Sequence, residues 1–459
     1  MKKISILAIL LVIFSMFSVP ASALGAPLDE VKKIVSESYM GEFPKNLQKI
    51  TSIDKIVEQL DPYSTYFTKE EFEAYTSSIN NTTTGIGVVI EENEKGILIV
   101  NTYEGGNAIK AGIVPGDIIL SINSTSAKNM SVQQASSLIT GKEGTTVQLE
   151  VLKATNQKKV FKITRTKFQV PIVTKELLHG NVGYISLNTF SDDGAILVRQ
   201  AKTALMRQGA TSFILDLTNN GGGYVQAAEE LIGLFPNSPY AYKLNLRNEE
   251  QLVSSLKSTS LFPKNTKVLV NGYSASASEM TAGALLDQKS ATLYGQKTYG
   301  KGSMQSFYPL SDGSYLKLTT AHFTGPKGTI INKTGITPQV VTEKGSELAK
   351  AHEDTLLATY KTYKKMSALS NVATTKEFTV TFSMPVADKG QSQKLELVKL
   401  GGQSVPVTVK QKSETQFVIK PKTPLEKGAA YLLVVHPTFQ EKDGEWMKVG
   451  AYAEVTVQQ

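Results

Sequence analysis

The chain has 459 residues, of which 41% are hydrophobic and 20% charged, as expected for a globular protein of about two to four domains. It contains no cysteine, which excludes disulfide bonds and cysteine-ligated metal sites. The formal net charge of +8 occurs without a dense basic run interleaved with aromatic residues, so we do not expect nucleic acid as a partner. A mildly cationic surface would instead favour association with anionic cell-wall polymers or a membrane surface.

Residues 1–23 have the features of an export signal. Two lysines precede an apolar run at residues 4–19, and Ala21 and Ala23 fit the small-residue rule for signal cleavage. An uncleaved anchor is the alternative, because the apolar run nearly reaches the length that crosses a bilayer. We expect cleavage after Ala23. Either interpretation predicts an extracytoplasmic protein, secreted or held on the outer side of the cytoplasmic membrane.

Residues 24–83 have a helical pattern. Val31, Ile34 and Val35 recur at helical spacing, which predicts an amphipathic helix. Thr68 is followed by Lys-Glu-Glu-Phe, so we expect it to be the N-cap of another helix.

Residues 84–168 follow a second pattern. A glycine turn at 84–87 leads into β-rich sequence, Val-Pro-Gly-Asp-Ile-Ile at 114–119 reads as a turn and a strand, and a helix is predicted at 132–139. This ordered set resembles a PDZ domain, which binds an extended peptide end as an added strand and holds its carboxylate with loop N–H groups. The resemblance makes Gly85, Ile86, Gly87 and Val88 the peptide-binding residues. The implied partners are proteins or peptides with accessible C-termini.

Strands and helices alternate between residues 182 and 300, which predicts an α/β core. The strand at 213–217 is followed by Thr-Asn-Asn-Gly-Gly-Gly. A glycine run after a strand could hold phosphate, but no Lys-Ser/Thr follows, which excludes a P-loop. We therefore interpret the run as a source of a backbone N–H donor for an acyl oxyanion, acting together with the amide of Ala277.

The strongest chemical signal lies between residues 271 and 305. Ser276 follows an apolar strand and a small-residue turn and stands where a helix should begin, in a field that favours developing negative charge. A serine nucleophile needs a base. Lys301 is flanked by glycines, and a lysine in apolar surroundings loses its proton near neutral pH. Gln305 follows four residues later and could orient the amine, so the segment predicts a serine–lysine hydrolase.

The motifs Ala-Ser-Ala-Ser-Glu and Thr-Tyr-Gly-Lys-Gly-x-x-Gln resemble those of the carboxyl-terminal processing (tail-specific) serine peptidases. The resemblance covers roughly residues 50–345 and includes Leu-Asp-Pro-Tyr-Ser-x-Tyr at 60–66. It implies that Ser276 is the nucleophile, Lys301 the general base and Gln305 its support, with no metal or organic cofactor. It places the second oxyanion donor at Gly222 or Gly223.

The same resemblance implies a crotonase-like core with an inserted PDZ domain, and a homodimer formed through the N-terminal helices. Two positions depart from the family pattern. Ser290 stands where arginine is usual, and Gln339 stands where aspartate commonly follows the proline. Neither touches the proposed dyad, so we expect them to alter local packing only.

The predicted protease core, residues 169–370, ends in a helix expected over about 346–368. Residues 376–459 change character, with alternating or apolar strands between turn signals. They resemble the Ig-like modules of bacterial surface proteins, so we expect a C-terminal all-β domain. The whole chain is then an α/β multidomain protein.

Arg165 lies on the last predicted PDZ strand, where the chain passes to the protease core. Relatives tend to carry an arginine here, and a planar guanidinium can bridge two domains through several hydrogen bonds. We expect Arg165 to make such bonds when a peptide fills the PDZ groove. The alternative is a solvated charge on an edge strand.

Two other functions remain open. The chain could be a non-catalytic adaptor that tethers envelope proteins through its PDZ and Ig-like domains, although an adaptor does not need Ser276, Lys301 and Gln305 together. It could also be a hydrolase that pairs Ser276 with His322 or His179. The leading interpretation is an exported serine endopeptidase that captures polypeptide C-terminal ends and cleaves by a Ser-Lys dyad.

Overall fold

The computed structural model describes residues 27–79, 82–103, 105–130, 132–153, 155–386, 394–440 and 444–458. The predicted signal segment at 1–23 lies outside these residues. The chain divides into two compact units, one of the described residues up to Phe72 with Gln305–Thr320 and the other of Glu73–Met304 with the chain from Ala321 onward. No helix in the described ranges is both long and apolar enough to cross a membrane.

The first unit forms around the amphipathic helix predicted from sequence. Val31 and Val35 are fully buried against Leu316 and Leu318. Strand β1 pairs with β18 in antiparallel register, with Tyr66 opposite Leu316. The elements of this unit are α1 (Pro27–Ser38), the 3-10 helix η1 (Leu47–Lys49), α2 (Ile53–Val57), β1 (Thr65–Phe67) and the parts of β17 (Ser303–Pro309) and β18 (Tyr315–Thr324) within 305–320.

Helix α3 (Lys69–Ile79) follows β1. The Glu71 N–H donates to Thr68 Oγ1 at 3.2 Å, and the Thr68 N–H donates to Glu71 Oε2 at 2.8 Å. This reciprocal pair is a capping box, and it confirms the predicted N-cap.

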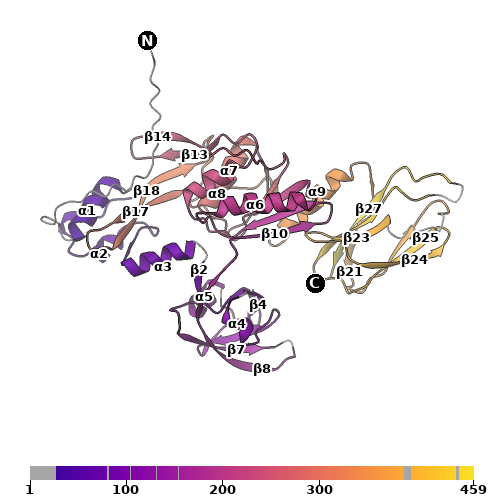
Figure 1. Cartoon of the computed structure of the whole chain (residues 1–459), viewed down its shortest axis with the longest axis horizontal. Helices are drawn as coiled ribbons and strands as arrows, with labels where there is room; N and C mark the ends of the chain where they lie inside the picture. Colours follow the sequence, from indigo (N-terminus) through magenta and orange to yellow (C-terminus); the bar gives the residue numbers. More distant parts are fainter. Residues whose placement is uncertain are drawn as a thin grey trace, which may run out of the picture. The chain divides into compact units, whose positions relative to one another are not determined.

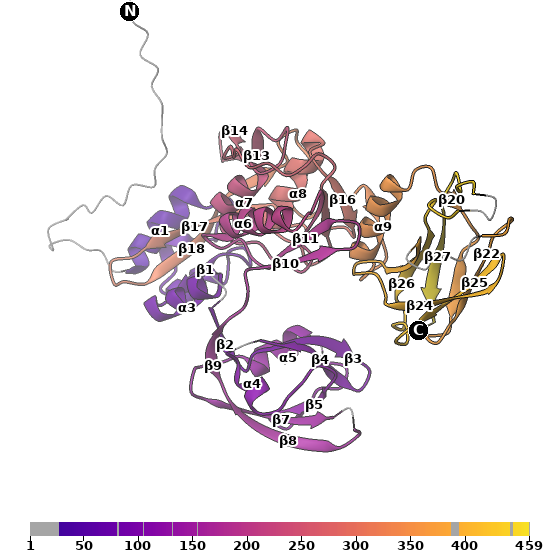
Figure 2. The ribbon, with the colours of Figure 1, turned by 45° about the vertical axis from the view of Figure 1, so that its right-hand side comes forward.

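The predicted PDZ segment forms a sheet of order β3-β4-β5-β7-β8, with β6 paired to β5, and α5 lies along β3 (Figure 2). Alternating Ile97, Ile99, Val147, Leu149 and Val151 fill its core. Its elements are β2 (Thr82–Gly85), β3 (Val88–Asn93), β4 (Gly96–Thr102), α4 (Asn107–Lys110), β5 (Ile118–Ile122), β6 (Thr125–Ser126), α5 (Val132–Ile139), β7 (Thr146–Leu152), β8 (Lys158–Thr164) and β9 (Thr166–Gln169), the last pairing with β2.

The central α/β segment has a six-stranded sheet of order β10-β11-β12-β15-β16-β19, parallel from β11 onward. Its edge strand β10 lies beside α6 (Figure 1). Both faces are covered, because Val268 and Val270 pack with α6, α7 and α8 while Leu269 packs with Ala351 of α9. This two-sided burial explains the continuous apolar runs of these strands. The elements are β10 (Val173–Leu178), β11 (Val182–Leu187), α6 (Gly194–Arg207), β12 (Ser212–Asp216), α7 (Val225–Ile232), β13 (Tyr240–Asn245), β14 (Glu250–Ser254), β15 (Lys267–Val270), α8 (Ala277–Gln288), β16 (Thr292–Gly295), β19 (Val340–Val341) and α9 (Glu347–Thr359).

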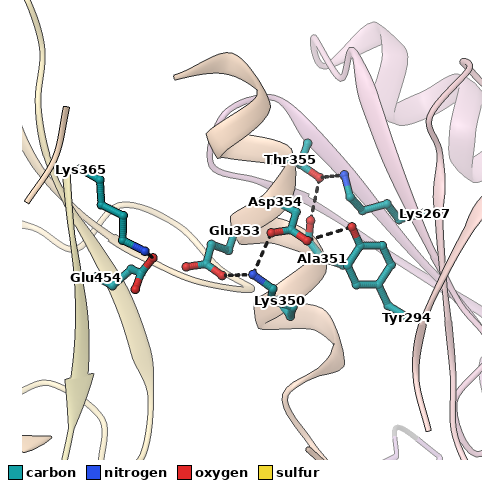
Figure 3. A network of polar contacts seen from close by, with 9 residues as sticks. All are labelled: Lys267, Tyr294, Lys350, Ala351, Glu353, Asp354, Thr355, Lys365 and Glu454. Atoms are coloured by element: carbon teal, nitrogen blue, oxygen red, sulfur yellow. Dashed lines mark hydrogen bonds and ion pairs between the residues drawn. The ribbon is translucent and has the colours of Figure 1, made fainter. Parts of the chain in front are cut away.

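Polar side chains also fix α9 on the sheet (Figure 3). Lys267 of β15 donates to Thr355 Oγ1 at 2.6 Å, and Tyr294 of β16 donates to Asp354 Oδ2 at 3.0 Å. On the helix itself, Lys350 forms an ion pair of 2.9 Å with Asp354. These contacts fix the side of α9 that faces the sheet.

Helix α9 is shorter than the sequence predicts, because it ends at Thr359 rather than near residue 368. Tyr360 and Tyr363, expected on the helix, lie in the turn after it and stack with centroids 4.7 Å apart. Tyr360 packs in a cluster with Val398 and Leu432 of the C-terminal domain, which draws the chain away from the helical path.

The C-terminal domain is a sandwich of a five-stranded and a three-stranded sheet around one apolar cluster that includes Phe378, Phe417 and Val455, as predicted for an all-β module. Its strands are β20 (Lys364–Lys365), β21 (Leu369–Val372), β22 (Phe378–Thr381), β23 (Leu395–Lys399), β24 (Val407–Ser413), β25 (Gln416–Pro421), β26 (Ala430–Val435) and β27 (Ala451–Val457).

Three histidines meet where α9 and the β10–β11 turn contact this domain. Fully buried His352 accepts a bond of 2.9 Å from the Gly401 N–H at Nδ1, and its Nε2 lies 2.8 Å from the His179 carbonyl oxygen. Both contacts are satisfied by the neutral tautomer with the proton on Nε2. Glu396 lies between the other two rings, 3.3 Å from His179 Nε2 and 3.2 Å from His436 Nε2.

The charge states at this junction follow from its geometry. Burial lowers the pKa of His352 to about 4, because a charged ring would lose its hydration there. Hydrogen bonds from His179 and His436 lower the pKa of Glu396 to about 2. The neutral His352 form contributes stability that is complete above pH 6.5 and is lost as pH falls toward 4. The Glu396 contribution is lost at lower pH, between 4.5 and about 2.

We therefore expect thermal stability to fall as pH is lowered from 7 to 4, and His352→Asn to reduce this fall. Asparagine can still accept from the Gly401 N–H but cannot be protonated, so the difference between the two proteins isolates the histidine. Melting temperatures at several pH values measure it. Identical pH slopes in both proteins would contradict the assignment.

Candidate active site

Ser276 stands at the start of α8, directly after the turn that follows β15. Its backbone has φ 56° and ψ −113°, a positive-φ conformation that residues other than glycine rarely adopt. Its side chain is partly exposed, whereas α8 residues from Ala277 to Leu285 are buried. The serine is therefore presented at the surface by a helix that is itself held in the core.

The turn before Ser276 is bonded to the loop after β12. Ser274 Oγ donates to the Leu217 carbonyl at 2.8 Å and accepts from the Asn271 N–H at 2.9 Å. The Asn219 N–H donates to Asn271 Oδ1 at 3.0 Å. Since β12 and β15 are parallel neighbours, their carboxyl ends meet at one sheet edge, which brings the two loops together.

Asn220 is the fully buried centre of this arrangement. Its carbonyl oxygen accepts from the Ala275 N–H at 3.1 Å and from Ser278 Oγ at 2.8 Å. Its side chain donates to the Leu187 carbonyl at 2.7 Å and accepts from the Gly222 N–H at 2.9 Å. One residue thus fixes the glycine run against the serine turn.

Gly222 lies directly against the Ser276–Ala277 backbone. It has φ 105°, and a Cβ added to it would lie 2.8 Å from Ser276 Cβ and 3.0 Å from Ala277 N. Only glycine fits at this distance. The triple-glycine run, predicted as an oxyanion element, is therefore brought beside the predicted nucleophile.

The two glycine candidates for the oxyanion donor differ in their bonding. The Gly222 N–H is already donated to Asn220 Oδ1. Gly223 forms a β-bridge with Phe190. In this bridge the Phe190 N–H donates to the Gly222 carbonyl at 3.0 Å, and the Tyr224 N–H donates to the Phe190 carbonyl at 2.8 Å. Within the described ranges no acceptor for the Gly223 N–H is found.

Lys301 lies in the loop after β16, and its side chain is half-buried. The Tyr299 N–H donates to the Ser274 carbonyl at 3.1 Å, which attaches this loop to the serine turn. The Lys301 N–H donates to Glu279 Oε2 at 2.7 Å, and the Ser276 N–H donates to the same oxygen at 3.0 Å. The structure therefore brings the backbones of Ser276 and Lys301 onto one carboxylate.

Gln305 begins the second segment of the first unit. Its Nε2 donates to Thr319 Oγ1 at 3.1 Å, and Thr319 Oγ1 donates to Asp61 Oδ1 at 3.0 Å. The Thr319 N–H donates to Ser64 Oγ at 3.1 Å. The Leu-Asp-Pro-Tyr-Ser element, singled out in the sequence without a role, thus holds the strand pair that carries Gln305.

The two departures from the family pattern occupy packing positions. Ser290 Oγ donates to the Asn237 carbonyl at 3.1 Å. Gln339 Oε1 accepts from the Leu293 N–H at 2.7 Å, beside the β16–β19 pair. Both side chains thus bond to the backbone of a segment that is distant in sequence and adjacent in the fold.

In the predicted carboxylate loop of the PDZ segment, the carbonyls of Ile86 and Gly87 accept from the Ala108 and Tyr103 N–H groups at 2.8 and 2.9 Å. Gly87 has φ 80°, and a Cβ there would lie 2.6 Å from Gly106 Cα. The carbonyl sides of Ile86 and Gly87 therefore face the domain interior. Gly85 ends β2, and Val88 begins β3, the strand beside α5.

Arg165 is only 8% exposed, so it is not a solvated edge-strand charge. Its guanidinium donates to the carbonyls of Leu138, Ile139 and Thr146 at 2.8–3.0 Å and to Thr145 Oγ1 at 3.0 Å. Leu138 and Ile139 end α5, where a cation complements the helix dipole. These bonds all lie within the PDZ segment, and an interdomain role in a peptide-bound form remains a prediction.

The alternative histidine bases lie in other surroundings. His179 is engaged by Ser404 at 2.8 Å and by Glu396. His322 lies in β18, opposite Asn245. No cluster of three or more histidine or acidic side chains suited to a metal ion occurs within the described residues.

Sequence comparisons divide the chain into three parts. Residues 181–342 match the model of peptidase family S41, residues 76–152 match the PDZ domain and residues 366–453 match a bacterial Ig-like domain. The chain is 37% identical over 284 residues to the carboxy-terminal processing protease CtpA of Bacillus subtilis, covering 62% of this chain and 61% of that one. It is 35% identical over 291 residues to a probable CtpA-like serine protease of Staphylococcus haemolyticus, covering 62% and 58%.

The chain thus spans about three fifths of the length of these curated relatives. Among solved structures it is similar to a photosystem II D1 C-terminal processing protease, with 26% identity, a TM-score of 0.49 and coverage of 72% of this chain and 95% of that one. The similarity to peptidase family S41 therefore lies in residues 181–342, between a segment that matches the PDZ domain and one that matches a bacterial Ig-like domain.

Proposed function

We propose that this protein is an exported serine endopeptidase that binds polypeptide C-terminal ends through its PDZ domain and cleaves peptide bonds with a Ser276–Lys301 dyad. The observation that carries the proposal is the shared carboxylate, because the Ser276 and Lys301 N–H groups both donate to Glu279 Oε2. Two segments 25 positions apart in sequence are thereby held together at the start of α8.

In this mechanism Ser276 Oγ attacks the peptide carbonyl carbon while the neutral amine of Lys301 accepts the hydroxyl proton. The amides of Ala277 and Gly223 donate to the oxyanion, and Gly223 is the better candidate because the Gly222 N–H is already bonded. Lys301 then gives its proton to the leaving amine. Water hydrolyses the acyl-enzyme with Lys301 again as the base, while Gln305 supports the amine.

Further features remain proposals that rest on resemblance. A cleaved signal segment at 1–23, a crotonase-like classification of the core and a homodimer through the N-terminal helices belong to this group. The expected substrates are proteins or peptides with accessible C-termini, bound at Gly85, Ile86, Gly87 and Val88 as an added strand on β3. No cofactor is required by the mechanism.

An adaptor without catalytic activity is a weaker explanation. The strained backbone of Ser276 costs about 1–3 kcal/mol, and surrounding contacts must offset that cost. A tethering protein has no need for this strain, whereas in a hydrolase the strained turn exposes the nucleophilic side chain. The engaged ring of His179 likewise disfavours it as an alternative base.

Ser276→Ala and Lys301→Ala should each abolish proteolysis of an unfolded model protein while preserving the melting temperature, because members of one catalytic unit are not additive. Wild-type activity should rise with pH, since the neutral amine is the base. Lys297→Ala is the matched control, because this lysine is exposed on the same loop and should keep full activity. Retention of more than about a hundredth of the activity by Lys301→Ala would show that another base acts.

Arg165→Ala should lower cleavage of a PDZ-dependent substrate strongly, because the end of α5 beside the peptide groove loses its anchor. The melting temperature should also fall, since the backbone carbonyls of Leu138 and Ile139 lose a charged donor. Lys162→Ala, an exposed cation on β8, is the control. Cleavage and peptide binding equal to wild type would remove Arg165 from any regulatory role.

A further inference from the structure

The buried carboxylate of Glu279 bonds to the backbones of both proposed dyad residues. Glu279 has no exposed surface, although it is an ionisable residue in the first turn of α8. Burying a carboxylate is costly unless hydrogen bonds replace its hydration. The hydrogen-bond partners of Glu279 must therefore offset a substantial desolvation cost.

Each of the two carboxylate oxygens of Glu279 accepts two hydrogen bonds. Oε1 accepts from Thr298 Oγ1 at 2.6 Å and from the Gly300 N–H at 2.6 Å. Oε2 accepts from the Lys301 N–H at 2.7 Å and from the Ser276 N–H at 3.0 Å. Bonds to an ionised acceptor are short and stronger than neutral ones, so the four together fix the positions of their donors.

The four donors come from two separate segments. Ser276 precedes α8, whereas Thr298, Gly300 and Lys301 follow β16. Of these four bonds, only the one from the Ser276 N–H to Glu279 Oε2 belongs to the cap of α8, because it joins the N-cap backbone to the N3 side chain. The other three bonds do not serve the helix end, and they hold the lysine loop at a fixed distance from the serine.

Local strain makes this fixation necessary. The strain lies at Ser276, which has φ 56°, whereas the φ of 98° at Gly300 is one that glycine adopts readily. Thr298 adds a link to the next loop, because its Oγ1 accepts from the Ile336 N–H at 2.7 Å. Without the carboxylate, the bond from the Tyr299 N–H to the Ser274 carbonyl would still join the two segments, but the Ser276 and Lys301 N–H groups would lose their shared acceptor.

We propose that Glu279 is a positioning residue that sets the spacing of Ser276 and Lys301. This inference rests on the proposed peptidase function. Glu279 does not act as the base, because four donors already occupy its two oxygens. It acts through the backbones of the two dyad residues, where a misplacement of about 1 Å can cost about a hundredfold in rate.

The central experiment replaces Glu279 with glutamine in the full-length protein. Glutamine keeps the length of the side chain but turns one acceptor oxygen into a donor NH₂ group, which faces two N–H or O–H donors. We expect kcat on an unfolded model protein to fall about a hundredfold with KM changed less than about threefold. The rate of labelling by a serine-directed fluorophosphonate should fall in parallel, because it reports alignment of the nucleophile with its base.

Three further variants keep the test decisive if Glu279→Gln folds poorly. Thr298→Val removes the hydroxyl that donates to Glu279 and accepts from the Ile336 N–H, and it should lower kcat by a smaller factor while KM is maintained. Thr298→Ser keeps the hydroxyl and should retain kcat. Asp287→Asn is the matched control, because Asp287 accepts from the Lys327 N–H at 2.7 Å and from Thr329 at the opposite end of the same helix. It should change the melting temperature without changing kcat.

The outcomes separate this inference from the function on which it rests. If Ser276→Ala keeps wild-type activity, the proposed dyad fails, whatever Glu279 does. If Ser276→Ala is inactive while folded Glu279→Gln or Thr298→Val retains wild-type kcat, positioning by Glu279 is overturned. If the fall in kcat of Glu279→Gln is fully accounted for by the fraction of the variant that is unfolded at the assay temperature, Glu279 has a structural role only.

Discussion

The strained, positive-φ backbone of Ser276 is the constraint on which the proposed site depends. A non-glycine residue holds φ 56° only when its surroundings fix the chain on both sides. Here Asn220 holds the preceding Ala275, buried α8 holds the following residues, and the Glu279 carboxylate holds the Ser276 N–H itself. The strain is local, but the contacts that maintain it reach across three neighbouring strands.

The sheet supplies the common edge for these contacts. Strands β11, β12, β15 and β16 run in parallel, so the loops after them emerge at one end. The Leu187 carbonyl, Asn220, the serine turn and the lysine loop come from the ends of these four strands in order. Each buried polar group at this edge bonds to the neighbouring loop, which is how irregular backbone can be buried at low cost.

The Ig-like domain is joined to α9 by apolar and polar contacts together. Leu356 and Tyr360 pack with Val398 and Leu432, and the neutral ring of His352 is bonded to the Gly401 N–H. An apolar cluster of this kind is insensitive to pH, whereas the histidine is not. Protonation of His352 would therefore weaken the polar part of this contact and leave the apolar part unchanged.

Local sequence signals by themselves predicted several helix starts, turns and candidate site residues of this protein. The periodicity of α1, the capping box at Thr68, the start of α8 at Ser276 and the turn at 114–117 before β5 are all local, because each depends on residues within a few positions. The motifs also identified Ser276, Lys301 and Gln305 as candidates. The sequence Gly-Gly-Gly does not show which glycine N–H is available to an oxyanion. The structure distinguishes them, because Asn220 Oδ1 accepts the Gly222 N–H.

Tertiary structure decided the contacts between distant segments. Glu279 stands inside a recognised motif, yet three of its donors lie 19–22 residues away and meet it only because β15 and β16 are neighbours. The burial of Arg165 and the early end of α9 at Thr359 likewise depend on partners far along the chain. A sequence pattern specifies what one segment prefers, and only the order of strands in the sheet determines which segments lie close enough to bond.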